Sequence, residues 1–323
     1  MTRHAVTTPE LDRAEQEWWQ RNSDLEERFC WVQTPSLQNL LRGRYLREVA
    51  GVVQPGDSVL EVGCGTGWFA ILLAQQGISN VVGVDFSPAQ IARARAAAGR
   101  AGVHDRARFE VGGLGDIGRG LDRRPDVVVM HAFLHHLSTD EIRRVLAAAA
   151  ALLAEGGRLV VFEPVGVQDG RPGPPIALRL QRRMERAPMT LHRCRLRPIG
   201  TAEAEVRRRL SDRGVGTAAP FGPAPKEAPF EARELEGLLE EHVKIDRCVP
   251  GLATAHLVTQ EMLMAQLSQP RFWQAALLPA AWLARALDRR LLAIDPAPST
   301  VWVFHLYLCS KPAAPAFGPS PRG

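Results

Sequence analysis

The feature that most constrains the fold is the run VLEVGCGTG, from Val59 to Gly67. Apolar and β-branched residues lead into a turn built on alternating glycines, and an apolar helical pattern follows. Such a turn lets backbone N–H groups come close to a ligand, because no Cβ stands between them. The N-terminus of the next helix favours an anionic group at the same place. The run therefore predicts a strand–turn–helix unit that binds a ligand.

An acidic residue ends the next strand-like run, VVGVD, from Val81 to Asp85. A carboxylate at this spacing beyond a glycine turn is suited to accept hydrogen bonds from ribose hydroxyls. The alternatives are an ordinary turn aspartate and a glycine turn that is structural or binds a nicotinamide dinucleotide. Dinucleotide sites usually read G-x-G-x-x-G. The glycines here are spaced G-x-G-x-G, with Glu61 ahead of them.

Together, VLEVGCGTG and the later VVGVDFSP resemble the nucleotide-binding half of the class I S-adenosylmethionine (SAM) methyltransferases. The resemblance covers the chain from Tyr45 to Pro164 and returns near the C-terminus. It implies an α/β fold with a doubly wound, mostly parallel, seven-stranded sheet. It also implies SAM as the cofactor and methyl transfer as the activity.

The same resemblance places the cofactor-binding residues at the ends of successive strands. Glu61 and the glycines would hold the amino-acid part of SAM, Asp85 would hold the ribose, and Phe86 would stack on adenine. The family often has an acidic residue after the third strand for the adenine amino group. This chain has VGGL there, so Asp116 or the backbone near Leu114 is expected to take that role. The expected set is Glu61, Gly63, Cys64, Gly65, Gly67, Asp85, Phe86, Leu114, Asp116 and His131.

Candidate catalytic residues follow the fourth predicted strand, in the sequence HAFLHHL. His131 stands at the strand exit, beside the expected sulfonium, and His135 and His136 precede a capped helix. An imidazole can take a proton from an acceptor hydroxyl near neutral pH. Glu163, at the exit of the fifth strand, is suited to orient an acceptor. SAM is already activated, so a base is not required. The alternative for the histidines is that one packs in the core and the other caps a turn, and the alternative for Glu163 is a solvated charge at a strand end.

Strand and helix signals alternate through the centre of the chain, which favours a parallel sheet covered by helices. Helix caps are predicted at Ser87, with Gln90 completing a capping box, and at Ser138. The predicted strands are Val59–Val62, Val81–Asp85, Ala107–Val111, Asp126–Met130, Arg158–Phe162, Val243–Val249 and Val301–Cys309. The expected organisation is an N-terminal helical cap (1–44), a SAM-binding core (45–165), an arginine-rich lid or insertion (166–228), a return to the core sheet (229–250 and 299–311), a helical insertion (251–298) and a disordered tail (312–323).

The segment from Gly166 to Gly216 carries more positive charge than the whole chain, whose formal net charge is +5. Such a cluster is suited to bind phosphate or nucleic acid, or to form a solvated lid whose arginine stems cover apolar surface. No aromatic residues are interleaved with the arginines, which favours the lid. The Asn/Asp-Pro-Pro-Tyr/Phe motif of nucleic-acid base methylases is also missing after the fourth strand. Both observations disfavour a nucleic-acid partner.

The five cysteines are scattered without C-x-x-C spacing, so neither a zinc site nor a disulfide framework is predicted, and no metal is expected. No apolar signal core and no apolar run of about 20 residues is present. These features predict a soluble, cytoplasmic protein without a transmembrane segment. Trp273 and Trp282 are suited to line an apolar pocket, to dock on a membrane surface or to contact a second subunit.

The resemblance implies methyl transfer from SAM to a small molecule, and by analogy with the family the large helical additions imply an acceptor that is bulky and partly apolar, as in secondary metabolism. Oxygen is the preferred acceptor atom, because His135 and His136 are candidate bases. The alternatives are a SAM-binding protein that catalyses a non-methylating step such as cyclisation, an RNA or protein methylase that uses the arginine-rich segment, and a non-enzymatic partner subunit.

Overall fold

The computed structural model describes residues 6–21, 45–165, 224–228, 230–250, 279, 282–283, 285–290, 293 and 304–312. The segment from Gly166 to Gly216, Trp273 and the tail beyond residue 312 lie outside the described residues. The domain boundaries predicted from the sequence therefore remain predictions. Trp282 is described and exposed. Within the described part of the chain, every helix is too short or too polar to cross a membrane.

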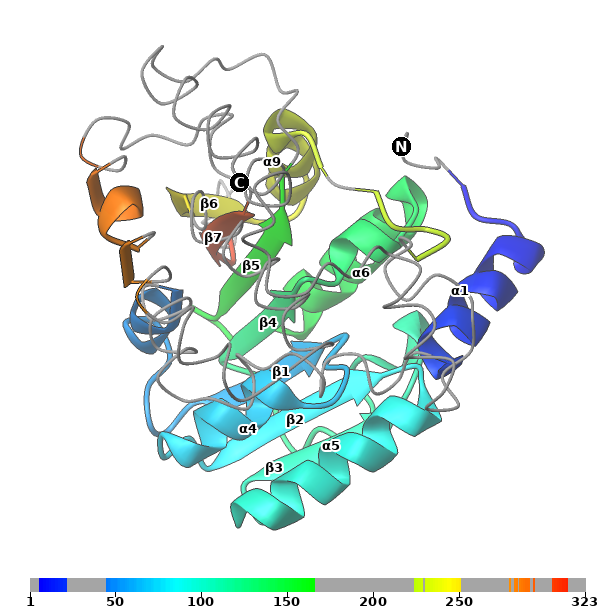
Figure 1. The fold of residues 1–323 in the computed structure, drawn as a ribbon, viewed down its shortest axis with the longest axis horizontal. Helices are drawn as coiled ribbons and strands as arrows, with labels where there is room; N and C mark the ends of the chain where they lie inside the picture. Colours follow the sequence, from blue (N-terminus) through cyan, green and yellow to red (C-terminus); the bar gives the residue numbers. More distant parts are fainter. Residues whose placement is uncertain are drawn as a thin grey trace, which may run out of the picture.

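A seven-stranded sheet forms the centre of the molecule, in the order β3-β2-β1-β4-β5-β7-β6 (Figure 1). Its first five strands run parallel, β7 is antiparallel to β5, and β6 is antiparallel to β7. This confirms the doubly wound, mostly parallel sheet predicted from the sequence. The strands are β1 (Ser58–Val62), β2 (Asn80–Asp85), β3 (Ala107–Val111), β4 (Val127–His131), β5 (Arg158–Pro164), β6 (Lys244–Pro250) and β7 (Phe304–Ser310).

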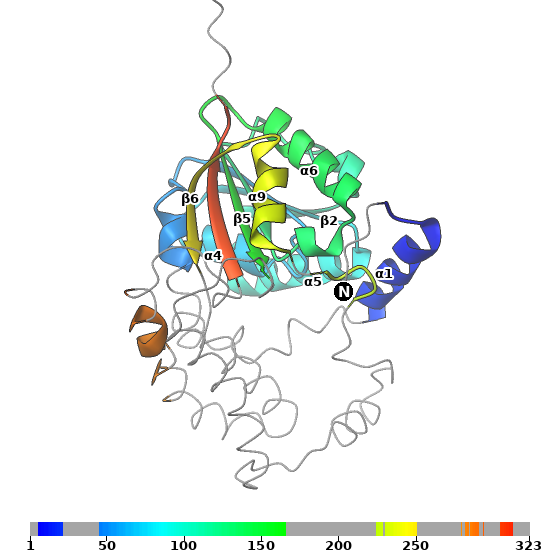
Figure 2. The ribbon, with the colours of Figure 1, turned by 90° about the horizontal axis from the view of Figure 1, so that it is seen from above.

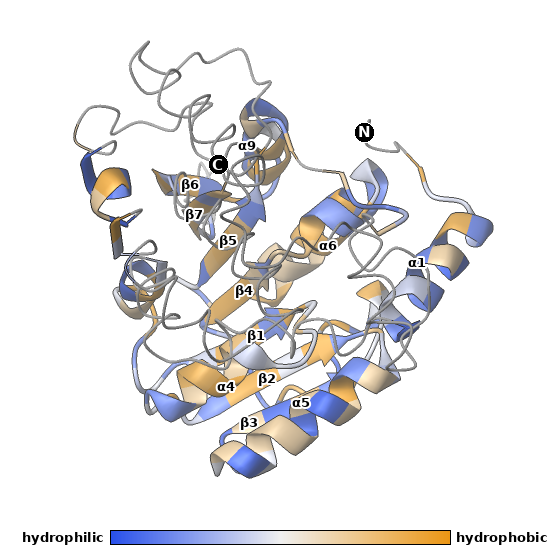
Figure 3. Cartoon of the chain, viewed as in Figure 1, coloured by the Kyte–Doolittle hydropathy of each residue, from blue (hydrophilic) through white to orange (hydrophobic). Residues whose placement is uncertain are grey.

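Helices cover both faces of the sheet (Figure 2). On one face, α4 (Trp68–Gln75) and α5 (Pro88–Ala101) bury residues such as Phe69 and Ile91 against the strands. On the other face, α6 (Thr139–Leu152) and α9 (Ala232–Glu240) bury Leu146 and Leu235. The central strands are apolar on both sides (Figure 3), as expected for parallel strands between two helical layers. The order of strands reverses between β1 and β4, and ligands bind α/β sheets at such a reversal.

Several predicted strand boundaries differ from the observed ones by one or two residues. The fifth strand continues past Phe162, because Glu163 and Pro164 pair with His305 and Phe304 of β7. Glu163 is therefore inside the sheet instead of at a solvated exit. The sixth strand runs one residue later than predicted, and β7 is described from Phe304 onward.

The two predicted helix caps have different outcomes. At the start of α6, Ser138 and Glu141 form the full capping box, with both reciprocal hydrogen bonds. At the start of α5, Ser87 Oγ accepts from Gln90 N–H, as predicted. The reciprocal bond is not made, because Ser87 N–H donates to Asp85 Oδ1 at 2.9 Å. The prediction of a complete capping box at Ser87 is therefore wrong.

Candidate functional site

A cavity of about 260 Å³ opens at the carboxyl ends of β1, β2 and β4, beside the reversal of strand order. One part of its wall comes from the strand ends and the turns that follow them: Val62, Gly63, Gly65, Val84, Asp85, Phe86, Gln90, Gly112, Gly113, Leu114, Ile117, His131, Ala132, Phe133, His136 and Leu137. The other part comes from α1 (Pro9–Arg21), the start of α6 and the segment 224–228: Asp12, Glu15, Gln16, Trp19, Glu141 and Lys226.

The structure divides the sequence-predicted site residues into two groups. Gly63, Gly65, Asp85, Phe86, Leu114, His131 and His136 line the cavity. Six predicted site residues do not line the cavity, although each lies in or next to an element that contributes to its wall: Glu61, Cys64, Gly67, Asp116, His135 and Glu163. The binding and catalytic roles of both groups remain predictions, and the contacts below show what each residue does in the fold.

Asp85 is fixed by the glycine turn. Its Oδ2 accepts from Gly65 N–H at 3.0 Å, and its Oδ1 accepts from Ser87 N–H at 2.9 Å. The two backbone donors therefore orient the carboxylate along the cavity wall.

Two glycines of the turn have steric reasons to be glycine. Gly63 has φ +71°, and a Cβ there would lie 2.2 Å from the Phe133 ring. Gly67 has φ +74°, and a Cβ there would lie 2.4 Å from Phe109. Gly63 thus allows the turn after β4 to close against the cavity, whereas Gly67 packs against the core.

The acidic residues expected beside the cofactor have structural partners. Glu61 is buried, and its Oε2 accepts from Ala70 N–H in the first turn of α4 at 3.0 Å. Asp116 Oδ2 accepts from Gly113 N–H at 3.2 Å, and its Oδ1 lies 3.0 Å from Arg119. Of the two candidates for the adenine amino group, Leu114 lines the cavity and Asp116 does not.

His131, the last residue of β4, is held in an aromatic cluster. Its ring stacks on Phe162 at a centroid distance of 5.2 Å and is nearly parallel to Phe69 at 5.9 Å. The Tyr45 and Trp68 rings are also within 5.5 Å. The cavity wall at the end of β4 is therefore an imidazole set among aromatic rings.

Glu163 and His135 form a buried clamp on the turn after β4. Glu163 is 0% exposed, and its Oε1 accepts from Phe133 N–H at 2.8 Å and Leu134 N–H at 2.7 Å. Its Oε2 lies 2.7 Å from His135 Nδ1. Ala132, just before this clamp, has the unusual φ of +51°. The clamp holds this strained turn in the position from which it lines the cavity.

His136 is the histidine of the HHL sequence that faces the cavity. Its Nδ1 lies 3.1 Å from Glu15 Oε1 of α1, and the Trp19 ring meets it edge-on at 5.1 Å. Burial and then the charge of His135 lower the pKa of His136, against the opposite effect of Glu15. The imidazole is therefore neutral near pH 7 and can accept a proton there.

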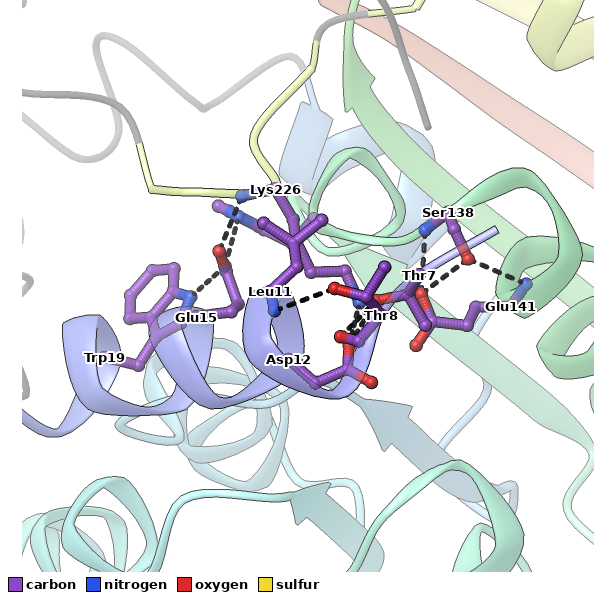
Figure 4. Close-up of polar contacts among 10 residues, drawn as sticks. Thr7, Thr8, Leu11, Asp12, Glu15, Trp19, Ser138, Glu141 and Lys226 are labelled. Carbon is purple, nitrogen blue, oxygen red and sulfur yellow. Dashed lines mark hydrogen bonds and ion pairs between the residues drawn. The ribbon is translucent and has the colours of Figure 1, made fainter. Parts of the chain in front are cut away.

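The helix α1 is attached to the core by Lys226, whose side chain is 5% exposed (Figure 4). Lys226 Nζ contacts Asp12 Oδ1 of α1 at 2.9 Å and Glu141 Oε2 of α6 at 2.7 Å. The backbone N–H of Lys226 donates to Glu15 Oε2 at 2.8 Å. Three segments distant in sequence thus meet at one ammonium group, and all three line the cavity. The single available sequence signal was that Lys226 is one of three lysines in an arginine-rich chain.

Acidic pH is expected to loosen the attachment of α1. Burial raises the pKa of Asp12 and of Glu15, but the partners of each carboxylate outweigh it, so both pKa values lie below the ordinary range. The pKa of His136 is lowered as well. All three groups bind fewer protons in the folded than in the unfolded chain, so they stabilise the fold at neutral pH. The contribution of His136 is lost as the pH falls below about 6.5, and that of the carboxylates below about 4.

Hydrogen exchange of the α1 amides, corrected for the intrinsic pH dependence, measures this loosening. The equilibrium constant for opening of α1 should increase as the pH falls from 7.5 to 5. In the His136→Gln variant, most of the increase between pH 7.5 and 5.5 should be absent. An opening equilibrium that is constant over this range would contradict the expectation. Amides of α5 serve as the internal control, because these three groups do not contact that helix.

Parts of the chain that contribute to this cavity are similar in sequence to known methyltransferases. Residues 59–157 match a family model described as a methyltransferase domain. A segment of 120 residues is 34% identical to 27-O-demethylrifamycin SV methyltransferase of Amycolatopsis mediterranei (strain S699), covering 36% of this chain and 43% of that protein. A segment of 115 residues is 34% identical to ribosomal protein L11 methyltransferase of Pelotomaculum thermopropionicum (strain DSM 13744 / JCM 10971 / SI), covering 36% and 35%.

Among solved structures, the fold is similar to that of the cyclase SpnF, with a TM-score of 0.50 and 19% identity over 84% of this chain and 81% of that chain. The family model over residues 59–157, the curated relatives and the seven-stranded sheet support a class I SAM-dependent methyltransferase with SAM as its cofactor. The chain matches less than half the length of these two curated relatives.

Proposed function

We propose that this protein transfers the methyl group of SAM to a hydroxyl oxygen of a bulky, partly apolar small molecule, as a cytoplasmic enzyme of secondary metabolism. The observation that carries the proposal is Asp85, held by the glycine turn at the wall of the cavity. The match to the methyltransferase model supports methyl transfer. The relative named 27-O-demethylrifamycin SV methyltransferase supports an acceptor of this size and chemistry.

The residues around the cavity fit the cofactor. The turn at Gly63 and Gly65 admits close contact, the Asp85 carboxylate suits the ribose diol, and Phe86 and Leu114 suit the base. SAM, when bound, supplies a methyl group already activated by the sulfonium. The chain is then required to hold the acceptor oxygen in line and to exclude water. The clamped turn from His131 to Phe133 and the helix α1 would form the walls that do so.

His136 is proposed as the group that takes the acceptor proton. It lines the cavity, it is neutral near pH 7, and the Glu15 carboxylate stabilises the imidazolium that forms. His135 is occupied by Glu163 and does not line the cavity. We therefore assign proton transfer to His136, and a positioning role to His135 and Glu163.

The proposed activity is tested by incubating the protein with SAM and a panel of hydroxylated and aminated metabolites, including macrocyclic polyketides. Mass spectrometry should find a methylated product and S-adenosylhomocysteine in equal amounts. An isomerised acceptor without S-adenosylhomocysteine would instead show a non-methylating step such as cyclisation. Methylation of RNA or protein, with none on small molecules, would overturn the proposed acceptor class.

Replacing His136 with Gln should lower the turnover rate by about 100-fold or more, because a general base typically contributes this much. The rate of the unaltered enzyme should fall at acid pH with a pKa below 6.5, and this limb should disappear in the variant. SAM affinity, measured by calorimetry, should change little. His104→Gln is the matched control, since His104 is exposed and away from the cavity. Identical pH–rate profiles for the variant and the unaltered enzyme would exclude His136 as the base.

A further inference from the structure

Glu15 is a buried carboxylate on α1, the helix that forms one wall of the cavity. It is 6% exposed, and burying a charged carboxylate is costly unless its partners compensate. Its Oε2 accepts from the backbone N–H of Lys226 at 2.8 Å, and its Oε1 accepts from the indole N–H of Trp19 at 2.8 Å (Figure 4). The same Oε1 lies 3.1 Å from Nδ1 of His136, the proposed base. Glu15 is therefore held in place from two sides and directed at the imidazole.

The segment 224–228 fixes the position of Glu15 relative to His136. Besides the hydrogen bond from Lys226 N–H to Glu15, the N–H of Ala228 donates to the backbone oxygen of His135 at 2.9 Å. One short segment is therefore bound both to α1 and to the turn after β4. The carboxylate and the imidazole come from distant parts of the chain, and their distance depends on this shared attachment.

The carboxylate determines which ring nitrogen of His136 is basic. A neutral imidazole has one N–H and one basic nitrogen, and the partner of one nitrogen sets the state of the other. A carboxylate only accepts hydrogen bonds, so Glu15 favours the proton on Nδ1 and leaves Nε2 basic. The ring of His135, at a centroid distance of 4.0 Å, and that of Trp19, at 5.1 Å, restrict rotation of the imidazole. The arrangement therefore favours one tautomer in one orientation.

We propose that Glu15 is a positioning residue for methyl transfer, which holds His136 in the tautomer with its proton on Nδ1. The acceptor O–H bond then breaks and its proton passes to Nε2. The acceptor oxygen forms its bond to the methyl carbon, and the electrons of the carbon–sulfur bond remain on sulfur. The imidazolium donates Nδ1–H to Glu15, which does not take the proton. This inference rests on the proposed function and adds that the site is complete only with α1 in place.

Nitrogen NMR of the unaltered protein tests the tautomer directly, with His136→Gln used to assign the ring signals. At pH 7.5 the neutral imidazole of His136 should carry its proton on Nδ1. A proton on Nε2 in a protein that methylates a small molecule would overturn the inference and leave the proposed function standing. A protein that methylates no small molecule would remove the proposed function, and the inference with it. This measurement does not change Glu15, so it decides the matter even if variants of Glu15 do not fold.

Glu15→Gln tests whether the carboxylate acts through His136. Removing the negative charge weakens the base, so the turnover rate should fall by about 10-fold, less than on loss of the base itself. Because Glu15 raises the pKa of His136, the acid limb of the pH–rate profile should move to lower pH in the variant. The other charged groups that act on this imidazole, His135 in the turn after β4 and Glu227 in the segment 224–228, are unchanged in the variant.

Two further variants separate this role from a structural one. Glu17→Gln makes the same change at an exposed position of α1, and it should alter neither the turnover rate nor the acid limb. In the His136→Gln background, Glu15→Gln should cause no further loss of turnover, because two residues that act as a unit are not additive. An equal loss in both backgrounds, or an acid limb that does not move, would show that Glu15 only supports the fold, and the inference would be wrong.

Discussion

Replacing Glu163 with leucine is expected to destabilise the fold by about 3–5 kcal/mol, because each buried polar group left without its hydrogen-bond partner costs about 1–3 kcal/mol. The variant leaves two buried backbone donors, Phe133 N–H and Leu134 N–H, without an acceptor, and His135 Nδ1 without its hydrogen-bond partner. The strained turn at Ala132 then loses the contacts that hold it. Urea denaturation measures the loss of stability. The turn lines the cavity, so we expect cofactor affinity to fall as well.

Glu163→Gln is the matched control, because it keeps the shape of the clamp. Its carbonyl can still accept from both backbone donors, while its NH2 group must donate to His135 Nδ1. The His135 proton therefore moves to Nε2, a change that nitrogen NMR of the imidazole detects. The free energy of unfolding of Glu163→Gln should therefore be much closer to that of the unaltered protein than that of Glu163→Leu. If leucine and glutamine are equally damaging, or leucine is harmless, Glu163 does not hold the turn in the way described.

Replacing Asp85 with alanine is expected to lower the affinity for SAM by about 100-fold or more. In the proposed cofactor site the ribose loses its acceptor, and hydrogen bonds to a charged group contribute about 1.5–3 kcal/mol each. Gly65 N–H and Ser87 N–H also lose their partner, so the glycine turn loses its link to the end of β2. Calorimetry with SAM and S-adenosylhomocysteine measures the effect.

Two controls separate binding from folding in this experiment. Asp105→Ala removes an exposed carboxylate of the same type, and it should change neither affinity nor thermal stability. Asp85→Asn keeps one carbonyl acceptor, and its affinity should lie between those of the alanine variant and the unaltered protein. Unchanged affinity in a folded Asp85→Ala variant would remove Asp85 from the cofactor site.

The sheet was predictable from the sequence because buried parallel strands are apolar on both faces and end in glycines or acidic residues. Strand ends were harder to predict, because pairing with a distant partner extends a strand past its apolar run. Glu163 is the clearest instance: its position follows from pairing with His305, and nothing local to the sequence EPVG indicates it.

The residues that line the cavity were predictable where one turn positions them, and they were not predictable where several segments meet. Gly63, Gly65 and Asp85 come from consecutive strand ends, so their spacing carries the information. His135 and His136 are neighbours in sequence, and their different surroundings follow from the short 3₁₀ turn η3 (Leu134–His136), which directs one to Glu163 and the other to the cavity. Asp12 and Lys226 are more than 200 positions apart, and no periodic pattern links them.

The position of β7 has a consequence for how the chain is completed during synthesis. This strand lies between β5 and β6, yet it follows β6 by the whole length of residues 251–303. Until residue 310 has left the ribosome, β5 has an unpaired edge and β6 has no neighbour to join. During synthesis, the edges of β5 and β6 that pair with β7 in the folded protein are therefore exposed, and the nascent chain must avoid aggregation through them until β7 has been made.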